Sequence, residues 1–218
     1  MSFEETSKRL GRKLQESVPK EWDGRKAILE LKEAGTKYWK QMEWIGFYFQ
    51  YLCETHLPPH MTVPGPRYGN VGFDGLCDIA WDFKAHAINT SSHQVIVNDS
   101  AAIAEAIKDD GAVGVILALG EVVYNDDERT FKAWHDELKG DKSKYEIERI
   151  RRGAWSRLRK VFFDLKQISF IRITDDTLVK CGSFQGDFRN ADGSPRREKV
   201  LLDLEKLEED LIYFVEFD

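Results

Sequence analysis

The apolar run Gly111–Gly120 (GAVGVILALG) constrains the fold more than any other stretch of the chain. It is continuous rather than alternating, and glycines bound it at both ends. Such a run is typical of a central strand that is buried on both faces of a sheet. Its glycines lie within the strand rather than between a strand and a helix, so they do not form a dinucleotide-binding loop.

The order of elements around this run predicts an α/β fold. Strand, strand, strand, helix, strand and helix follow one another across residues 71–140, which indicates a central mixed β-sheet flanked by helices, with extra C-terminal strands. An acidic helix is expected just before the last strand. The predicted helices cover 3–17, 23–33, 36–55, 101–108, 126–138 and 143–163, and the predicted strands cover 79–88, 94–98, 111–120, 167–173, 177–181 and 212–217.

Length and composition fit a single domain with its own core. The chain has 218 residues, of which 42% are hydrophobic and 32% charged, as in soluble globular proteins. No apolar run is long enough to span a bilayer, and the N-terminus lacks the apolar segment of a signal peptide. Three widely spaced cysteines argue against a disulfide framework or a zinc site. We therefore expect no membrane partner and a reducing, cytoplasmic location.

The stretch Val71–Ile88 carries the most distinctive chemistry. Side chains alternate faces in a strand, so Asp82, Lys84 and His86 share one face of the strand predicted over 79–88. Such a polar face is costly to bury without a task. Carboxylates that bind a divalent cation, next to an amine that binds a phosphate, would supply one. His86 is expected either to contact a phosphate or water, or simply to cap the polar face.

Two acids compete for the place beside Asp82. Asp78 has the same strand parity, but residues four apart on one strand lie about 13 Å apart, which is too far to chelate one ion. Asp74 can instead fold back across the turn Gly75–Asp78. We therefore favour Asp74 and expect Asp78 to be a turn residue or to support the site from outside; the residues alone leave both open.

Asp74, seven intervening residues and Asp82-Phe83-Lys84 together resemble the signature of the PD-(D/E)XK nucleases. Gly72-Phe73-Asp74 stands where that signature nominally has Pro-Asp. The resemblance covers residues 36–140 and implies a restriction-endonuclease-like core with Asp74, Asp82 and Lys84 as catalytic residues. It further implies a Mg²⁺ cofactor, which Mn²⁺ can replace, bound by Asp74 and Asp82. Some members take a further metal ligand from a preceding helix, a part that Glu54 or Glu43 could play.

This chemistry suits the cleavage of a phosphodiester, which is an anion that resists attack by hydroxide. Two adjacent carboxylates repel each other and so favour a hard dication between them. The metal lowers the pKa of its bound water and neutralises charge that builds on the phosphate. Lys84 can position the water or stabilise the phosphorane oxygen, and its acidic neighbours favour this electrostatic role over that of a general base.

The charge pattern allows a nucleic-acid face on an acidic chain. The net charge is −6, but basic residues cluster over 142–160 and acidic ones over 201–218. Arg149, Arg152 and Lys160 could line one side of a helix, or form a solvated face with partners such as Glu148. Side chains that can read base edges occur in the polar loop 182–199, and the proline-rich loop 58–69 lies just before the catalytic hairpin. The predicted DNA-binding residues are Arg67, Gln185, Arg189, Asn190, Arg196 and Arg197.

The sequence thus predicts one nuclease domain over 1–218, with its catalytic core in 36–140 and elements for DNA contact and dimerisation in 141–218. The predicted function is that of a Mg²⁺-dependent type II restriction endonuclease, a homodimer acting on double-stranded DNA. Two alternatives remain at this point: a structure- or modification-specific DNA repair nuclease, and a non-catalytic nucleic-acid-binding protein.

Overall fold

A mixed β-sheet organises the chain in the computed structural model, which describes residues 2–124, 127–140, 142, 144–153, 158–186 and 195–217. Its strand order is β1-β8-β7-β5-β4, and β11 also pairs with β8. Strands β5 and β7 run parallel, whereas β7 and β8 run antiparallel. The strands are β1 (Glu21–Asp23), β4 (Gly75–Cys77), β5 (Ile79–Ala87), β7 (Val113–Val123), β8 (Phe162–Ile173) and β11 (Ile212–Glu216).

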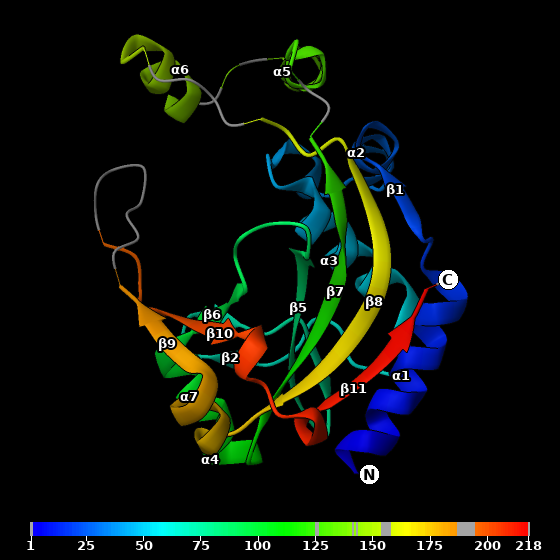
Figure 1. The fold of residues 1–218 in the computed structure, drawn as a ribbon, viewed down its shortest axis with the longest axis vertical. Coiled ribbons are helices and arrows are strands. Elements are labelled where there is room, and N and C mark those ends of the chain that lie inside the picture. Colours follow the sequence, from blue (N-terminus) through cyan, green and yellow to red (C-terminus); the bar gives the residue numbers. More distant parts are fainter. Residues whose placement is uncertain are drawn as a thin grey trace.

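Helices flank this sheet, as Figure 1 shows, so the predicted fold class of a central mixed sheet flanked by helices is confirmed. A second sheet has the order β6-β10-β9, and β2 pairs with β3 in a short ribbon. The helices are α1 (Phe3–Ser17), α2 (Gly24–Glu33), α3 (Trp44–His56), α4 (Ser100–Asp110), α5 (Thr130–Lys139), α6 (Lys144–Arg151) and α7 (Asp175–Cys181); the remaining strands are β2 (Arg67–Tyr68), β3 (Val71–Gly72), β6 (Gln94–Asp99), β9 (Gly182–Gln185) and β10 (Lys199–Asp203).

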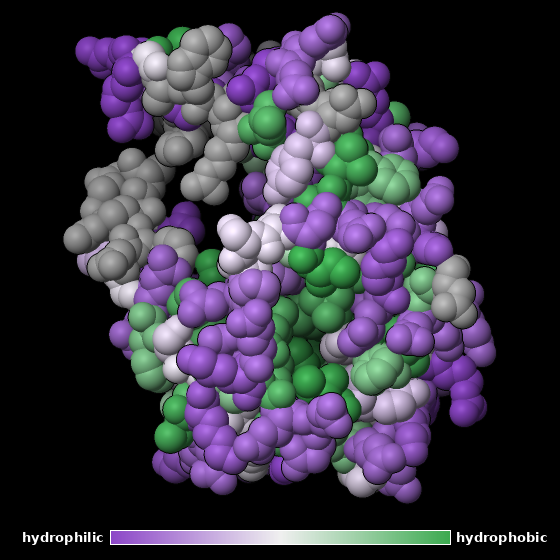
Figure 2. All heavy atoms as spheres, viewed as in Figure 1, coloured by the Kyte–Doolittle hydropathy of each residue, from purple (hydrophilic) through white to green (hydrophobic). Residues whose placement is uncertain are grey.

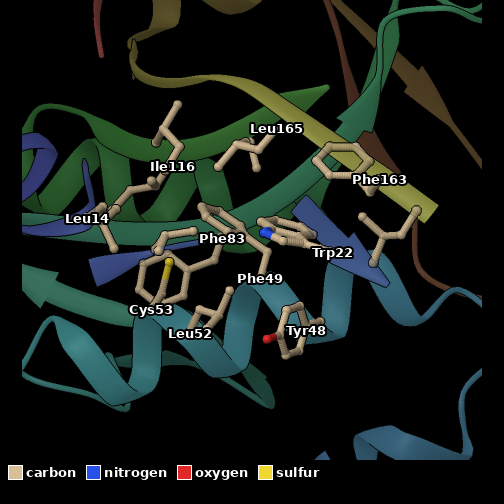
Figure 3. Close-up of a cluster of buried hydrophobic side chains, with 14 of the residues drawn as sticks. Leu14, Trp22, Tyr48, Phe49, Leu52, Cys53, Phe83, Ile116, Phe163 and Leu165 are labelled. Atoms are coloured by element: carbon tan, nitrogen blue, oxygen red, sulfur yellow. The ribbon is translucent and has the colours of Figure 1, made fainter. Parts of the chain in front are cut away.

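Burial on both faces explains the continuous apolar sequence of β7. Each face of the strand packs into a different hydrophobic core. Ile116 and Ala118 pack into a cluster with α1, α2 and α3, which Figure 3 shows in close-up. Val115 and Leu117 point the other way, into a cluster with α4, β6 and β10. A strand that is buried on both faces has no polar positions to offer, which is why the run does not alternate.

The face of the sheet to which Val115 and Leu117 point is covered by a helix only in part. The rest of this face carries an apolar groove. Figure 2 shows hydrophobic residues gathered in a hollow with hydrophilic margins. The groove has a volume of about 620 Å³ and lies along β7, β8 and β11. Its apolar lining consists of Leu117, Leu119, Ile171, Leu204, Leu207, Ile212 and Phe214.

Gly114 lets the indole of Trp81 lie directly against β7. A Cβ atom at position 114 would stand 2.3 Å from Trp81 Cε3, and Trp81 is fully buried. We predict that Gly114→Ala lowers the free energy of unfolding by about 1–3 kcal/mol, because neither the ring nor the strand can move away. Denaturant unfolding measures the change. Gly46→Ala is the matched control, since a Cβ there meets no atom within 4 Å; an equal loss in both variants would contradict the prediction.

Four predicted elements differ from the structure. The acidic helix expected before the last strand is wrong, since two 3-10 turns, Leu204–Lys206 and Glu209–Leu211, stand there instead. The helix expected over 36–55 begins only at Trp44, after the 3-10 turn Tyr38–Lys40. The long helix expected over 143–163 is wrong, since α6 ends at Arg151 and β8 begins at Phe162. The strand expected over 177–181 is also wrong. It is helix α7, because Thr174 caps its first turn and accepts a hydrogen bond from the backbone of Thr177.

The catalytic core predicted over 36–140 does not contain the whole sheet. Strands β1 and β8 lie outside that range, and β8 pairs with β7 along its full length. The predicted strand over 94–98 exists as β6, but it pairs with β10 in the second sheet rather than in the central one. Within the described residues, no helix combines the length and the hydropathy that crossing a membrane requires.

Candidate active site

The hairpin of β4 and β5 positions Asp74 at the outer edge of β5. Asp74 stands immediately before β4, where its backbone N–H donates to the Trp81 carbonyl at 2.9 Å. Its carboxylate turns back to the same strand, and Oδ2 accepts a hydrogen bond from the Phe83 backbone N–H at 2.7 Å. This bond continues the strand pairing with a side chain in place of a backbone. The local geometry therefore fixes the Asp74 carboxylate beside the middle of β5.

Asp82 and Lys84 lie two residues apart on β5 and so share one face of the strand. Asp82 is 3% exposed. Its Oδ2 atom lies 2.7 Å from Lys84 Nζ, and the side chain of Lys84 is 26% exposed. This ion pair is close, and apart from Lys84 Nζ the described residues offer Asp82 Oδ2 no hydrogen-bond donor. A buried carboxylate oxygen with free acceptor capacity thus faces the site.

The two carboxylates and the ammonium group act on one another. Burial raises the pKa of Asp74 to about 7, and the neighbouring Asp82 carboxylate adds to this effect against the opposing pull of Lys84. Burial alone would lower the pKa of Lys84, but Asp82 and Asp74 outweigh it, so the pKa is raised. Lys84 is therefore a cation and not a neutral base. The site combines two adjacent acids that repel each other with one fixed positive charge.

Asp78 does not join this group. It occupies the turn between β4 and β5 with a left-handed φ of 61°, and its side chain is exposed. Its Oδ2 atom accepts a hydrogen bond from Thr6 Oγ1 of α1 at 3.0 Å. Of the two alternatives that the sequence left open, the structure places Asp74 beside Asp82 and Asp78 in the turn.

Helix α3 contributes a polar cluster behind Asp74. Gln50 Nε2 lies 3.1 Å from Asp74 Oδ1 and 2.9 Å from Glu54 Oε1, so its amide group links the two acids. The Tyr38 hydroxyl also donates to Glu54 Oε1, at 3.3 Å. Gln50 was not predicted as a site residue. The sequence did contain a signal for it, because Glu43, Gln50 and Glu54 are seven and four residues apart and share one face of a helix.

The predicted third metal ligand is not placed with the other two. Glu54 and Asp74 are linked through the Gln50 amide, which donates to both carboxylates. In the part of the chain that the structure describes, no group of three or more His, Cys, Asp or Glu side chains is arranged to hold a metal ion. Glu43, the other acid weighed for this role, is exposed and pairs with Lys160 at 3.1 Å. Glu43 is the residue before the first turn of α3 rather than part of the helix, and its partner is a cation.

Gln50 offers a test of this cluster. We predict that Gln50→Leu lowers the free energy of unfolding by about 1–3 kcal/mol, because Asp74 Oδ1 and Glu54 Oε1 both lose a partly buried donor. Chemical denaturation measures the loss. Thr55→Val is the control, since it removes a hydrogen bond to the Tyr51 carbonyl on the exposed side of the same helix. Equal stability of Gln50→Leu and the wild type would show that the amide does not hold Asp74.

His86 lies on the same face of β5 as Asp82 and Lys84 and makes a backbone contact. Its Nε2 atom lies 2.8 Å from the Ser92 carbonyl oxygen, and burial lowers the pKa of the ring. Of the two readings of this residue, the capping of a polar position is the one that the structure favours.

The predicted DNA-binding residues are spread over several elements. Arg67 is exposed in β2, and its Nη2 atom donates to the Asn70 carbonyl at 2.9 Å. Gln185 ends β9, and Arg196 and Arg197 are exposed before β10. Arg189 and Asn190 lie outside the described residues. On α6, Arg149 donates to Glu146, and Arg152, one residue beyond the helix, lies 3.7 Å from Glu148, so both arginines pair with acids of this helix. Figure 1 shows α6 beyond the upper end of the central sheet and β9 in the second sheet, beside the lower half of the central one.

Comparison with known proteins adds little to this geometry. No family model matches the chain, and no curated protein matches it in sequence. Among solved structures, the chain is similar to the restriction endonuclease BglI bound to its DNA recognition sequence, with 11% sequence identity and a TM-score of 0.41. The match covers 98% of this chain and 88% of that chain. Likeness at this TM-score is distant, so functional conclusions rest on the site itself.

Proposed function

We propose that this protein is a metal-dependent endonuclease that hydrolyses DNA phosphodiester bonds, with Asp74, Asp82 and Lys84 as its catalytic residues. The observation that carries the proposal is the geometry of one hairpin. It holds two adjacent, largely buried carboxylates at the edge of β5, and the Lys84 ammonium group lies 2.7 Å from one of them. The arrangement agrees with the resemblance of this stretch to the PD-(D/E)XK signature.

The donor set at this edge fits Mg²⁺. Mg²⁺ is usually bound by one or two carboxylates, keeps several of its waters, and takes further oxygen ligands from a substrate phosphate. Asp74 and Asp82 supply two carboxylates, and Asp82 Oδ2 has free acceptor capacity. A bound dication would relieve the repulsion that raises the pKa of Asp74. When bound, the metal would supply an activated water and charge neutralisation at the phosphate.

Asp74, Lys84 and the hydrophobic cluster behind β5 each have a defined role in the proposed reaction. Asp74 is oriented by the Phe83 N–H and the Gln50 amide, so its carboxylate cannot rotate away from the site. Lys84 stays protonated and can stabilise negative charge on the phosphate oxygens during attack. The hydrophobic cluster behind β5 keeps the strand rigid, which holds these groups in position.

The finer proposal is a type II restriction endonuclease that acts as a homodimer on a short site in double-stranded DNA. Exposed side chains near β10, Arg196 and Arg197, have the chemistry to pair with guanine edges in the major groove, and Gln185 can pair with adenine. A twofold symmetric site calls for two copies of the chain. A structure- or modification-specific repair nuclease remains the second candidate, because a pocket of about 350 Å³ lies beside Lys84.

Incubation of the protein with supercoiled plasmid DNA tests the proposal. In Mg²⁺ or Mn²⁺ we expect cleavage, with discrete fragments if the enzyme is site-specific, and in EDTA we expect none. Cleavage without defined ends on plain duplex, or cleavage confined to junctions and flaps, would favour the repair nuclease. A folded, metal-loaded protein that cleaves no form of DNA would refute the nuclease.

A further inference from the structure

The outer edge of β5 borders a pocket of about 350 Å³, directly beside Lys84. Strand β4 pairs with β5 only as far as Trp81, whereas β7 pairs with the opposite edge from Ala80 to Ala87. Beyond Trp81, no strand of the described chain pairs with the outer edge. The pocket extends from this free edge across the face of the sheet that α3 covers, as far as Val122 of β7 and Phe163 of β8, and the first turns of α3 close its other side.

The free edge also offers backbone hydrogen-bonding groups. In a parallel pair, successive residues point their N–H and C=O groups to alternate sides of the strand. Ile88 N donates to Gly120 O on β7, and Phe83 N donates outward to Asp74. Ala85 has the parity of Phe83, so its N–H and C=O point outward into the pocket that Ala85 lines.

The remaining walls are apolar below, and the charged residues that line the pocket are Lys84, Lys160 and Glu43. Phe83 and Phe163 are almost fully buried and form the floor, while Phe47 of α3 is partly exposed at the side. Lys84 and Lys160 both line the pocket, and Lys160 pairs with Glu43 at 3.1 Å. The partly exposed ring of Phe47, a backbone donor and acceptor, and two lysines match the parts of one nucleotide: base face, base edge and phosphate.

We propose that this pocket binds one unpaired nucleotide next to the phosphodiester that lies at Asp74 and Asp82. The inference rests on the proposed nuclease function and narrows its substrate. A pocket of this volume is at the small end of those that hold small molecules and has no room for a base pair. A base in a duplex keeps its faces stacked and its edge paired. The nucleotide must therefore be extruded from the duplex, or be unpaired in the substrate from the start.

Gly46 gives direct access to this pocket for a test. It lines the pocket on α3, and a Cβ atom there meets no atom within 4 Å, so a larger side chain would project into open space. Leucine is a better helix former than glycine, so Gly46→Leu is expected to fold. Gly46→Ala adds only a methyl group and is the graded control.

The first measurement is the binding of deoxyadenosine monophosphate to the metal-free protein, followed by isothermal titration calorimetry. Ribose 5-phosphate is the probe without a base. We expect saturable binding of the nucleotide, weaker binding of ribose 5-phosphate, and a loss of about tenfold in Gly46→Leu, comparable to the loss of one stacked base. Gly46→Ala should fall between the wild type and Gly46→Leu. Equal binding of both probes, or no effect of Gly46→Leu, would overturn the base-binding pocket.

The second measurement compares cleavage of a fully paired duplex with cleavage of the same duplex carrying a single unpaired nucleotide, in Mg²⁺. We expect the wild type to prefer the unpaired nucleotide and Gly46→Leu to lose that preference. Cleavage by a wild type that binds no mononucleotide would overturn the pocket and leave the nuclease standing. Mononucleotide binding that Gly46→Leu weakens, in a protein that cleaves no DNA, would overturn the nuclease and leave the pocket.

Discussion

Replacing Asp82 by asparagine should reduce metal-dependent DNA cleavage by at least about a thousandfold, since metal activation of water and phosphate supplies several kcal/mol of transition-state stabilisation. The side chain keeps its shape, but one of the two carboxylates that would bind the cation becomes neutral. Cleavage of plasmid DNA in Mg²⁺ measures the loss.

The same substitution should leave the metal-free protein at least as stable as the wild type. Asp82 is buried beside Asp74, and two adjacent carboxylates in a low-dielectric site repel each other. The asparagine amide removes this repulsion, while its oxygen can still accept a hydrogen bond from Lys84. Thermal unfolding in EDTA tests this expectation.

Metal should then stabilise the wild type but not Asp82→Asn, because a ligand that binds the folded state alone adds about 2.7 kcal/mol at a concentration of one hundred times its Kd. Asp78→Asn is the matched control, because Asp78 lies in the same hairpin but is exposed and contacts Thr6. It should keep both cleavage and metal stabilisation. Full cleavage activity in Asp82→Asn would remove this residue from the site.

The sequence was sufficient for the parts of the molecule that short-range rules determine. The apolar run around β7 and the alternation in β5 follow from the burial of strand faces, and both predicted strands exist. The rise per residue of a strand was enough to disfavour Asp78 as the partner of Asp82. The structure agrees with that inference, since Asp78 turns toward α1.

Two features that depend on contacts between distant parts of the chain, the first residues of strand β8 and the contact of Gln50 with Asp74, were not predicted from the sequence. Residues 162 and 163 were predicted as the end of a basic helix and 164–166 were assigned to no element, but Phe163 and Leu165 are fully buried and β8 pairs with β7 from its first residue. Their sheet partners are some forty residues away in the chain, beyond any local pattern. Gln50 was missed for the same reason. Its position in a helix was readable, but its contact with Asp74 depends on how α3 packs against β5.

Replacing Lys84 by methionine should reduce cleavage by about a hundredfold to a thousandfold, which is typical for the removal of one group that stabilises transition-state charge. Methionine keeps an unbranched side chain of similar length and removes only the ammonium group. Lys84→Arg keeps the charge with a different shape, so it should retain part of the activity. Lys8→Met is the control, since Lys8 forms an exposed ion pair with Glu4 on α1.

Metal binding should survive in Lys84→Met, in contrast to Asp82→Asn. The ammonium group lies 2.7 Å from Asp82 Oδ2, where it competes with any cation for that oxygen. Its removal should therefore leave the affinity for Mn²⁺ unchanged or increase it, as measured by the metal-induced rise in Tm. The two variants thus separate the two halves of the site: one loses the metal and keeps the amine, and the other loses the amine and keeps the metal. A protein whose acids are only structural would show no metal-induced rise in Tm in the wild type or in either variant.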